Sequence, residues 1–411
     1  MPHHYRGSAD DYPTYRLLPR HRANMQCEIM NRLRVAIVSD ALYPWHTGGK
    51  EFRYKHLFSL LPDQGLDIVV YSMKWWDEAP TPIRTPRGSL TYQSICRRVE
   101  MYNGRRRSIF QAVYFAVATL RLLTQRFDVI EADHMPYLQL VPLRLVAWFK
   151  RVPLVITWHE VWGKETWKDY IGRLGALAAL IERCSVRLPN AIVSASSGTA
   201  DKLIRMGARN VQVAPNTLDF DQLSNIVSFP SSPDLLFVGR LIEHKHADLA
   251  IEATKILLGR GLDVRLGIVG VGPEESRLRE QADDAGIGDR VNFFMSLDSQ
   301  GAVWSLIRGT KVLLAPSVRE GFGMVVAESL ALGTPVVCTE HPDNESRRLV
   351  SSDLGSRIRP FDALELADAA ERWLNDASSR DARRRAFLER HNDLTVEALV
   401  GTYASVLRGV T

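Results

Sequence analysis

Short apolar runs of strand length alternate along the chain with longer amphipathic segments. In the first half, runs rich in β-branched residues lie at residues 34–40, 67–72, 128–133, 153–158 and 191–196. After a loop-like stretch at 224–233, the alternation restarts with runs at residues 234–240, 263–270, 290–294, 311–317 and 334–339. Apolar strands separated by helical crossovers are typical of parallel sheets that are covered on both faces. The pattern therefore predicts two doubly wound α/β domains joined by a hinge near residues 216–233.

The length of the chain agrees with this division. Its 411 residues, 45% of them hydrophobic, can form two cores of roughly 150 to 200 residues each. We assign residues 1–31 to a disordered leader, because this stretch is rich in Arg, His, Tyr and Asp and has no apolar signal core. One Rossmann-like domain is expected at 32–218 and a second at 219–390. The final helical segment, 391–411, has the apolar positions to pack back on the first domain.

Charge and cysteine content narrow the class of protein. The 52 Lys and Arg residues exceed the 47 Asp and Glu residues only slightly, which argues against a dedicated nucleic-acid binder and fits anionic small ligands or a membrane surface. The four cysteines are scattered singly, so the sequence predicts neither a zinc site nor disulfides and favours the cytoplasm. No apolar stretch reaches the roughly 20 residues of a membrane span, and we expect no transmembrane helix.

The residues that could bind a ligand or take part in catalysis are concentrated in one stretch, APSVREGFGMVVAESLALGTPVV. Glu320 and Glu328 lie eight positions apart there, after a buried strand. Between them, Gly321 and Gly323 lie on a loop that opens a helix, whose free N–H groups and dipole can hold a diphosphate. We expect Glu328 two turns inside this helix, where its carboxylate can accept from a ribose diol, and Glu320 on the loop, facing sugar hydroxyls.

This stretch resembles the E-x7-E motif of retaining glycosyltransferases of the GT-B fold, family four, and the resemblance runs from about residue 33 to 375. The segment GRLIEHK at 239–245 is similar to the family's G-R-L-x-x-x-K signature, which implies that Arg240 and Lys245 hold the donor diphosphate. The resemblance also implies two Rossmann-like domains that face a central cleft. The first would be the acceptor side and the second would bind the nucleotide sugar, with Gly321, Phe322 and Gly323 among the donor-binding residues.

The surroundings of Lys245 support this role independently. Together with His244 and His246, Lys245 lies where a helix begins, and positive charge there opposes the helix dipole. Such departures from local rules often mark functional positions. The alternative is an exposed lysine that pairs with Glu243 or Asp248.

The first domain contributes two further candidates. Gly48 and Gly49 in HTGGKEF follow the first strand, where the family has a glycine-rich loop that approaches the donor; a tight turn into a helix near Lys50 is the alternative. His159 in VITWHEVWG ends a predicted strand and resembles the family histidine near the donor sugar, the alternative being a structural histidine. Its neighbour Glu160 is a weaker candidate for acceptor recognition.

The hinge contains a D-x-D pattern, Asp219 and Asp221, that elsewhere binds a metal with a nucleotide sugar. Here it faces no phosphate loop, so we expect no metal and no cofactor. The hinge segment VQVAPNTLDF resembles the family's P-N-G-V-D loop, with Thr217 in the place of glycine. Asn216 and Asp219 would either support the cleft or cap the linker.

Two groups of side chains fit either packing or surface contact. Trp75, Trp76, Trp158, Trp162 and Trp167 gather near the ends of predicted strands, where they could stack on an acceptor sugar, dip into lipid headgroups, or pack in the core, which we favour. A basic run at 105–107 precedes an apolar helix near 110–120, which suits peripheral contact with anionic lipid. An ordinary crossover helix with a solvated arginine cap is the preferred alternative.

The resemblance implies a retaining hexosyltransferase that works in the cytoplasm, with peripheral contact to the cytoplasmic membrane face as an option. His159, Arg240, Lys245 and Glu320 would carry the catalysis. The donor would be a UDP or GDP sugar, and the acceptor a hydroxyl of a glycan, a glycolipid or a small molecule. A sugar phosphorylase or a nucleotide-sugar epimerase on the same fold is the alternative.

Overall fold

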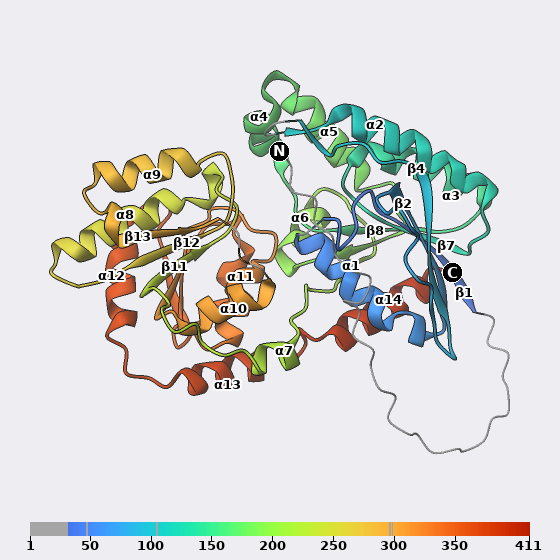
Figure 1. Ribbon diagram of the computed structural model, residues 1–411. Coiled ribbons are helices and arrows are strands. Elements are labelled where there is room, and N and C mark those ends of the chain that lie inside the picture. The colour runs from blue at the N-terminus through green and yellow to red at the C-terminus, as the bar shows by residue number, and fades with distance from the viewer. Residues whose placement is uncertain (1–31, 47, 104–105, 296, 298) are drawn as a thin grey trace, which may run out of the picture.

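The structure, a computed structural model, describes residues 32–411 except 47, 104–105, 296 and 298, so the expected leader lies outside the described residues. The described chain forms two α/β domains, each built around its own large sheet (Figure 1). The predicted fold class, two doubly wound domains, is confirmed.

The sheet of the first domain has eight strands in the order β10-β9-β8-β7-β1-β2-β4-β3. All neighbouring strands are parallel except β3, which runs antiparallel to β4 at one edge. The strands are β1 (Leu33–Val38), β2 (Leu66–Lys74), β3 (Ile83–Arg84), β4 (Ser89–Arg97), β7 (Val129–Asp133), β8 (Leu154–Trp158), β9 (Ala191–Ser194) and β10 (Val211–Val213). A separate two-stranded ribbon is formed by β5 (Tyr102–Asn103) and β6 (Arg106–Arg107).

Helices cover both faces of this sheet, which explains why its central strands are apolar throughout. One face is covered by α2 (Ile109–Ala118), α3 (Leu140–Lys150), α4 (Gly163–Ile171), α5 (Gly175–Ser185) and α6 (Ser197–Arg205), with the 3₁₀ turns η2 (Thr119–Thr124), η3 (Tyr137–Gln139) and η4 (Gly172–Leu174) between them. The other face is covered by α1 (Gly49–Leu60), which continues into η1 (Pro62–Gln64), and by the last helix of the chain, α14 (Val396–Gly409).

The second sheet is entirely parallel, in the order β13-β12-β11-β14-β15-β16. Its strands are β11 (Leu235–Val238), β12 (Leu266–Val269), β13 (Val291–Phe294), β14 (Val312–Ala315), β15 (Val336–Thr339) and β16 (Gly355–Ile358). Its first face carries α8 (Ala247–Gly259), α9 (Glu275–Asp284) and α12 (Ala363–Leu374). Its second face carries α7 (Phe220–Ser224), α10 (Gln300–Gly309), α11 (Met324–Ala331) and α13 (Arg380–Arg390). Three 3₁₀ turns complete the domain: η5 (Glu243–Lys245), η6 (Gly288–Arg290) and η7 (Glu345–Leu349).

The chain crosses between the domains twice. It leaves the first sheet after β10, and Leu218 already packs in the core of the second domain, where its N–H donates to the carbonyl of Leu394. After α13, the chain returns, and Tyr403 of α14 is fully buried against α1 and the first sheet. Figure 1 shows α14 lying beside α1, far from the rest of the C-terminal half. The two crossings place both sheets on either side of one domain boundary.

The ten strands predicted from apolar runs are all present, with ends that differ by at most three residues. The sequence analysis missed β3, β10 and β16, which are short and lie at sheet edges, and the ribbon of β5 and β6. It also missed β4, which lies next to the edge strand β3 and has exposed as well as buried positions. Edge strands are half covered and mix polar with apolar residues, so their pattern is weak. Among the described residues, no helix combines the length and apolar character needed to cross a bilayer.

Candidate functional site

The predicted phosphate side of the site lies where β11 and β14 end. Lys245, in the η5 turn before α8, forms an ion pair with Glu320, in the loop before α11. Both side chains are largely buried, and the backbone N–H of Val318 donates to the carbonyl of His244, which joins the two loops. The alternative partners of Lys245 that we considered, Glu243 and Asp248, are not used. The structure thus brings two predicted site residues into direct contact.

Positive charge gathers around this pair. Burial and, to a smaller extent, the neighbouring cations Arg319, Lys245 and Arg240 together lower the pKa of His244 to about 3, so the imidazole is neutral at neutral pH. Arg319 lies 3.5 Å from His244 Nδ1. Within the described chain, Arg240 forms no ion pair and its side chain is exposed, which leaves its guanidinium available to an anion.

The glycine loop sits directly against the first domain. A Cβ built on Gly321 would lie 2.6 Å from the carbonyl oxygen of His159, so only glycine permits this approach. Gly323 has φ of 90° and caps the start of α11 in the left-handed region, where a Cβ would also meet Ser346 at 2.2 Å. No side chain caps the N-terminus of α11, so its first N–H groups can serve an anion. Phe322 instead packs its side chain in the core beneath α11.

Glu328 is the fifth residue of α11, about one turn inside the helix rather than the two that we expected. Its side chain is buried, and Gln300 of α10 donates to Oε1 at 3.1 Å. Burial raises the pKa of Glu328 to about 7, although the hydrogen bond from Gln300 opposes this shift. The Glu328 carboxyl is therefore only partly ionised at neutral pH.

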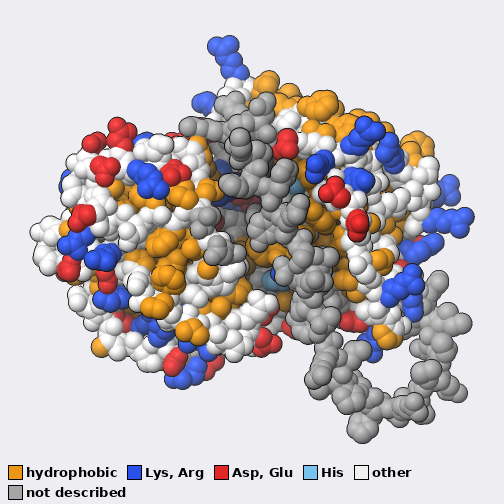
Figure 2. All heavy atoms as spheres, in the orientation of Figure 1, with side chains coloured by type: hydrophobic (Ala, Val, Ile, Leu, Met, Phe, Trp, Pro, Cys, Tyr) orange, Lys and Arg blue, Asp and Glu red, His pale blue; other side chains and the backbone are white. Residues whose placement is uncertain are grey.

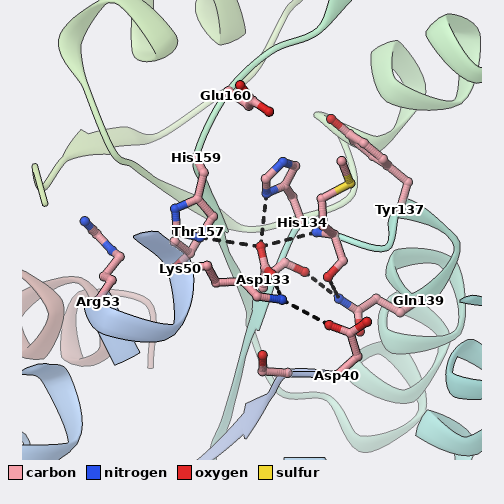
Figure 3. Close-up of polar contacts among 12 residues, drawn as sticks. Asp40, Lys50, Arg53, Asp133, His134, Tyr137, Gln139, Thr157, His159 and Glu160 are labelled. Carbon is pink, nitrogen blue, oxygen red and sulfur yellow. Dashed lines mark hydrogen bonds and ion pairs between the residues drawn. The ribbon is translucent and has the colours of Figure 1, made fainter. Parts of the chain in front are cut away.

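The first domain holds a buried ion cluster at the carboxyl ends of β1 and β7 (Figure 3). The ammonium of Lys50, at the start of α1, lies 3.0 Å from Asp40 Oδ1 and 2.7 Å from Asp133 Oδ2. Asp40 also pairs with Arg107 and accepts from Gln111 at 3.0 Å. Both carboxylates are fully buried, so Lys50 compensates two charges at once.

The charge states of this cluster follow from its pairing. Burial alone would raise the pKa values of Asp40 and Asp133, but the nearby cations outweigh it and hold both below the ordinary range. Burial would likewise lower the pKa of Lys50, yet Asp133 and Asp40 raise it above the ordinary value. His159 lies beside the cluster, with Nε2 3.6 Å from Asp133 Oδ1, and burial lowers its pKa to about 3. The imidazole of His159 thus faces Asp133, while its backbone carbonyl faces the glycine loop.

Gly48 and Gly49 lie at the start of α1, next to this cluster. A Cβ on Gly48 would meet the carboxylate of Glu51 at 2.7 Å, and one on Gly49 would lie 3.9 Å from Asn216 Nδ2. Gly48 therefore allows a close contact with Glu51, whereas a side chain at Gly49 would meet Asn216 only at an ordinary van der Waals distance. Thr47 of the same motif lies outside the described residues.

Asp133, His134 and His159 also have ligand atoms within 4.8 Å of one another. The Lys50 ammonium already contacts Asp133, and a metal ion at this position would be repelled by it. In the hinge, Asp219 accepts from the N–H of Gln222 at 2.9 Å and caps α7, which agrees with the capping alternative for the D-x-D pattern. Thr217 has no positive φ and bonds His56 at 2.8 Å, so this loop does not need the family's glycine.

Several aromatic and basic residues have structural positions. Trp158 is fully buried and stacks on His134, as core packing predicts, whereas Trp162 lies at the domain boundary with Arg319 5.0 Å above its ring. The expected solvated arginine cap on α2 is wrong for Arg107, which turns inward to Asp40, and Ser108 caps the helix instead. Arg105 lies outside the described residues.

The sequence analysis missed Asp40, Lys50 and Asp133. A signal was present, because Asp40 follows the buried strand β1 and Asp133 ends the buried strand β7, and the ends of neighbouring parallel strands meet at one edge. What the sequence did not reveal was that β1 and β7 are neighbours, since β2 and β4 lie between them in the chain.

Comparison with known proteins agrees with this architecture. Two family models match consecutive parts of the chain: "Glycosyltransferase Family 4" matches residues 47–222 and "Glycosyl transferases group 1" matches residues 219–388. Among curated relatives, a GDP-mannose-dependent alpha-(1-6)-phosphatidylinositol dimannoside mannosyltransferase of Mycobacterium tuberculosis is 30% identical over 174 residues, 40% of this chain and 44% of that protein. A D-inositol 3-phosphate glycosyltransferase of Acidothermus cellulolyticus is 35% identical over 193 residues, 42% of this chain and 41% of the relative. The chain thus spans less than half the length of each of these relatives.

Solved structures resemble the whole described fold. A sucrose-phosphate synthase from Thermosynechococcus elongatus superposes with a TM-score of 0.69 at 17% identity, over 92% of this chain and 99% of that one. Anabaena Alr3699/HepE, in complex with UDP and glucose, gives a TM-score of 0.68 at 17% identity, over 92% and 100%. At 17% sequence identity, these structural similarities establish the fold alone. With both domains matched by family models and the two facing sheets in place, the chain belongs to the GT-B glycosyltransferases of family 4.

Proposed function

We propose that this glycosyltransferase moves a hexose-type sugar from a UDP or GDP sugar to a hydroxyl acceptor with retention of the anomeric configuration. The observation that carries the proposal is the contact of Lys245 with Glu320 beside the point where Gly321 meets the His159 carbonyl. A cation for phosphate, a carboxylate for sugar hydroxyls and a tightly packed domain boundary thereby occur together.

In the proposed reaction, Arg240, Lys245 and the first N–H groups of α11 neutralise the diphosphate as it leaves. Glu328 accepts from the ribose, and Glu320 exchanges Lys245 for the sugar hydroxyls. The departing phosphate takes the acceptor proton on the same face, so no protein nucleophile is required. The protein contributes positioning and preorganised charge, which are the main terms for such a reaction. We propose that no metal takes part, because two cations and a helix N-terminus supply the positive field.

The names of similar proteins support this range of substrates. One relative is named as GDP-mannose-dependent, and one solved neighbour contains UDP and glucose. We therefore include both GDP sugars and UDP sugars as donors. Relatives that act on phosphatidylinositol mannosides and inositol phosphate support lipid-linked or small polar acceptors. We place the reaction in the cytoplasm, which agrees with the unpaired state of Cys96, Cys184 and Cys338.

A nucleotide-sugar panel tests the proposal. Purified protein is incubated with UDP and GDP hexoses and candidate acceptors, and released nucleotide and transferred sugar are quantified. We expect release that depends on an acceptor and a product whose first-formed anomer, by proton NMR, matches the donor. An inverted first product would exclude retention.

The same assay separates the alternatives. An epimerase would change the donor sugar without net transfer, and a phosphorylase would require inorganic phosphate and release a sugar phosphate. Excess chelator should leave the rate nearly intact. A collapse of the rate that magnesium or manganese restores would contradict the metal-free mechanism and direct attention to the Asp133, His134 and His159 group.

A further inference from the structure

An apolar surface covers the outer side of the N-terminal domain and takes no part in the proposed reaction. Helices α2, α3 and α5 lie on the same face of the first sheet, with contacts from α2 to α3 and from both α2 and α5 to the η3 turn between them. Large hydrophobic side chains project from them, among the most exposed being Phe110, Val117, Leu145, Trp148, Phe149 and Leu177. We call these positions the α2–α3–α5 surface. Figure 2 shows orange side chains, with blue ones beside them, along the upper edge of this domain.

These exposed side chains are not used to pack the helices against the sheet. In α2, Phe115 and its neighbours on one side fill the core, yet Phe110 on the other side is 68% exposed. In α3, Leu143 is buried while Trp148 and Phe149 are 64% and 65% exposed. Single exposed apolar residues are ordinary, but a continuous set across three helices marks a contact surface.

The charges that these helices expose have one sign. Residues 109–124 and 140–151 contain Arg121, Arg144, Lys150 and Arg151 and no Asp or Glu. The one acidic residue of α5, Glu182, is buried and accepts hydrogen bonds from Tyr137 and Trp167. A second copy of this surface would place cations opposite cations, whereas an anionic bilayer complements both the cations and the apolar side chains.

We propose that the α2–α3–α5 surface docks on an anionic lipid bilayer, with its aromatic side chains at the level of the headgroups. Trp148 and Phe149 line the same shallow groove as Arg144 and Arg151, so cations stand at the edge of the apolar side chains, where lipid phosphates would lie. This inference goes beyond the proposed transfer reaction and does not depend on it.

Docking in this way would set the cleft close to the bilayer. Helix α4 packs extensively on α5, and its residues Trp167 and Tyr170 contact Trp162, which lies under Arg319 of the second domain. Figure 1 shows α4 and α5 at the end of the first domain that is nearer the second domain. A lipid-linked acceptor could then reach the cleft by moving only its headgroup out of the bilayer.

The experiment measures co-sedimentation of the full chain with vesicles of phosphatidylcholine alone and of phosphatidylcholine with phosphatidylglycerol. The test variant is Phe110→Ser/Leu177→Ser, which removes exposed side chains without changing the net charge of +5. The matched control is Phe361→Ser/Leu364→Ser on the second domain, where exposure is similar, at 62% and 56% against 68% and 56%. Melting temperatures of the wild type and both variants confirm folding.

We expect the wild type to bind the anionic vesicles more strongly than the neutral ones. The test variant should lose at least about tenfold in partition coefficient, and the control should keep the wild-type value. Equal loss in both variants, unchanged binding in the test variant, or no binding of the wild type would overturn the proposal. A dimeric wild type that the test variant converts to a monomer, without vesicle binding by either, would identify the surface as a self-association interface instead.

Discussion

At the scale of single residues, Arg240 and Lys245 differ in what they contact before any donor binds. Lys245 pairs with Glu320, whereas Arg240 is exposed and has no ion-pair partner in the described chain. We expect Arg240→Ala and Lys245→Ala each to cost about 2 to 4 kcal/mol of transition-state stabilisation in kcat/KM, because the negative charge on the diphosphate grows as the bond breaks. The double variant should cost less than the sum.

Thermal melts separate this catalytic loss from misfolding. Arg240→Ala should melt like the wild type, and Lys245→Ala should lose up to about 3 kcal/mol of unfolding free energy, because Glu320 is left largely buried without its partner. The control is Lys311→Ala, which removes a lysine that pairs with Asp234 on the surface of the same domain at 2.9 Å. Near-normal kcat/KM and an unchanged melting temperature in Lys245→Ala would leave this lysine with no role in phosphate binding.

From the raised pKa of Glu328 we predict that donor binding depends on pH. Its pKa is raised to about 7, so the group adds stability to the fold below its ordinary value of 4.5, and this stability is lost as the pH rises through about 7. Only the ionised form is a strong acceptor for ribose hydroxyls. Affinity for a nucleotide sugar should therefore increase as the pH rises through about 7 in the wild type and stay level in Glu328→Gln.

Calorimetry at several pH values measures this affinity. Thermal melts at the same pH values measure the stability of both proteins. Between pH 4.5 and 8, Glu328→Gln should gain about 3 kcal/mol of stability relative to the wild type, because the amide never ionises. The difference between the two proteins is the informative quantity, since burial also raises the pKa of Glu131 to about 7 and that group titrates in both. Parallel affinity profiles in the two proteins would argue against a ribose contact.

At the scale of elements, the start of α1 is fixed to the sheet by Lys50. Replacing it in Lys50→Met leaves the carboxylates of Asp40 and Asp133 buried with less compensation, and we expect a loss of about 3 to 5 kcal/mol. The control, Lys55→Met in the same helix, removes a cation that lies 4.4 Å from the Tyr43 ring and should cost at most about 1 kcal/mol.

The shifted pKa values of Asp40, Asp133 and Lys50 determine how the free energy of unfolding changes with pH. The depressed carboxyl pKa values contribute stability above about pH 4, which is lost as the pH falls through them, and the raised pKa of Lys50 contributes stability below about pH 10. Chemical denaturation at pH 3, 7 and 9 should show the largest difference between wild type and Lys50→Met at the two higher values. An equal difference at pH 3 would mean that packing, and not charge, accounts for the loss.

At the scale of the whole molecule, the two domains touch beside the cleft through a small set of polar contacts. Glu345, buried in η7, accepts from the N–H of Gly198 at the start of α6 at 3.1 Å, and Asp343 pairs with Lys202 of α6. We expect that these contacts form part of donor-driven closure, because the donor residues lie in the second domain and His159 lies in the first.

Small-angle scattering measures this closure as a fall in the radius of gyration when saturating nucleotide sugar is added. Glu345→Ala leaves the Gly198 N–H unpaired in the closed form, so compaction should need a higher donor concentration. Glu340→Ala, which removes surface ion pairs with Arg347 and Arg357 within the second domain, should behave as the wild type. Donor binding without any compaction of the wild type would contradict closure.

The sequence alone determined the ten apolar strands of the two sheets and the family motif, for a local reason. A strand that is covered on both faces must be apolar along its whole length, and this is visible without knowing its partners. The E-x7-E stretch is likewise continuous in the chain, so Glu320, Gly321, Gly323 and Glu328 could be identified together.

Only the tertiary structure decided which distant residues meet. The order of the strands places Asp40 beside Asp133, and the approach of the domains places Gly321 against His159, although many residues separate the members of each pair. The exposure of Phe110 and Trp148 could not be predicted either, since an apolar residue on a helix packs or projects according to what covers that helix. Strand order, domain contact and surface coverage are long-range properties, and periodicity along the chain carries no information about them.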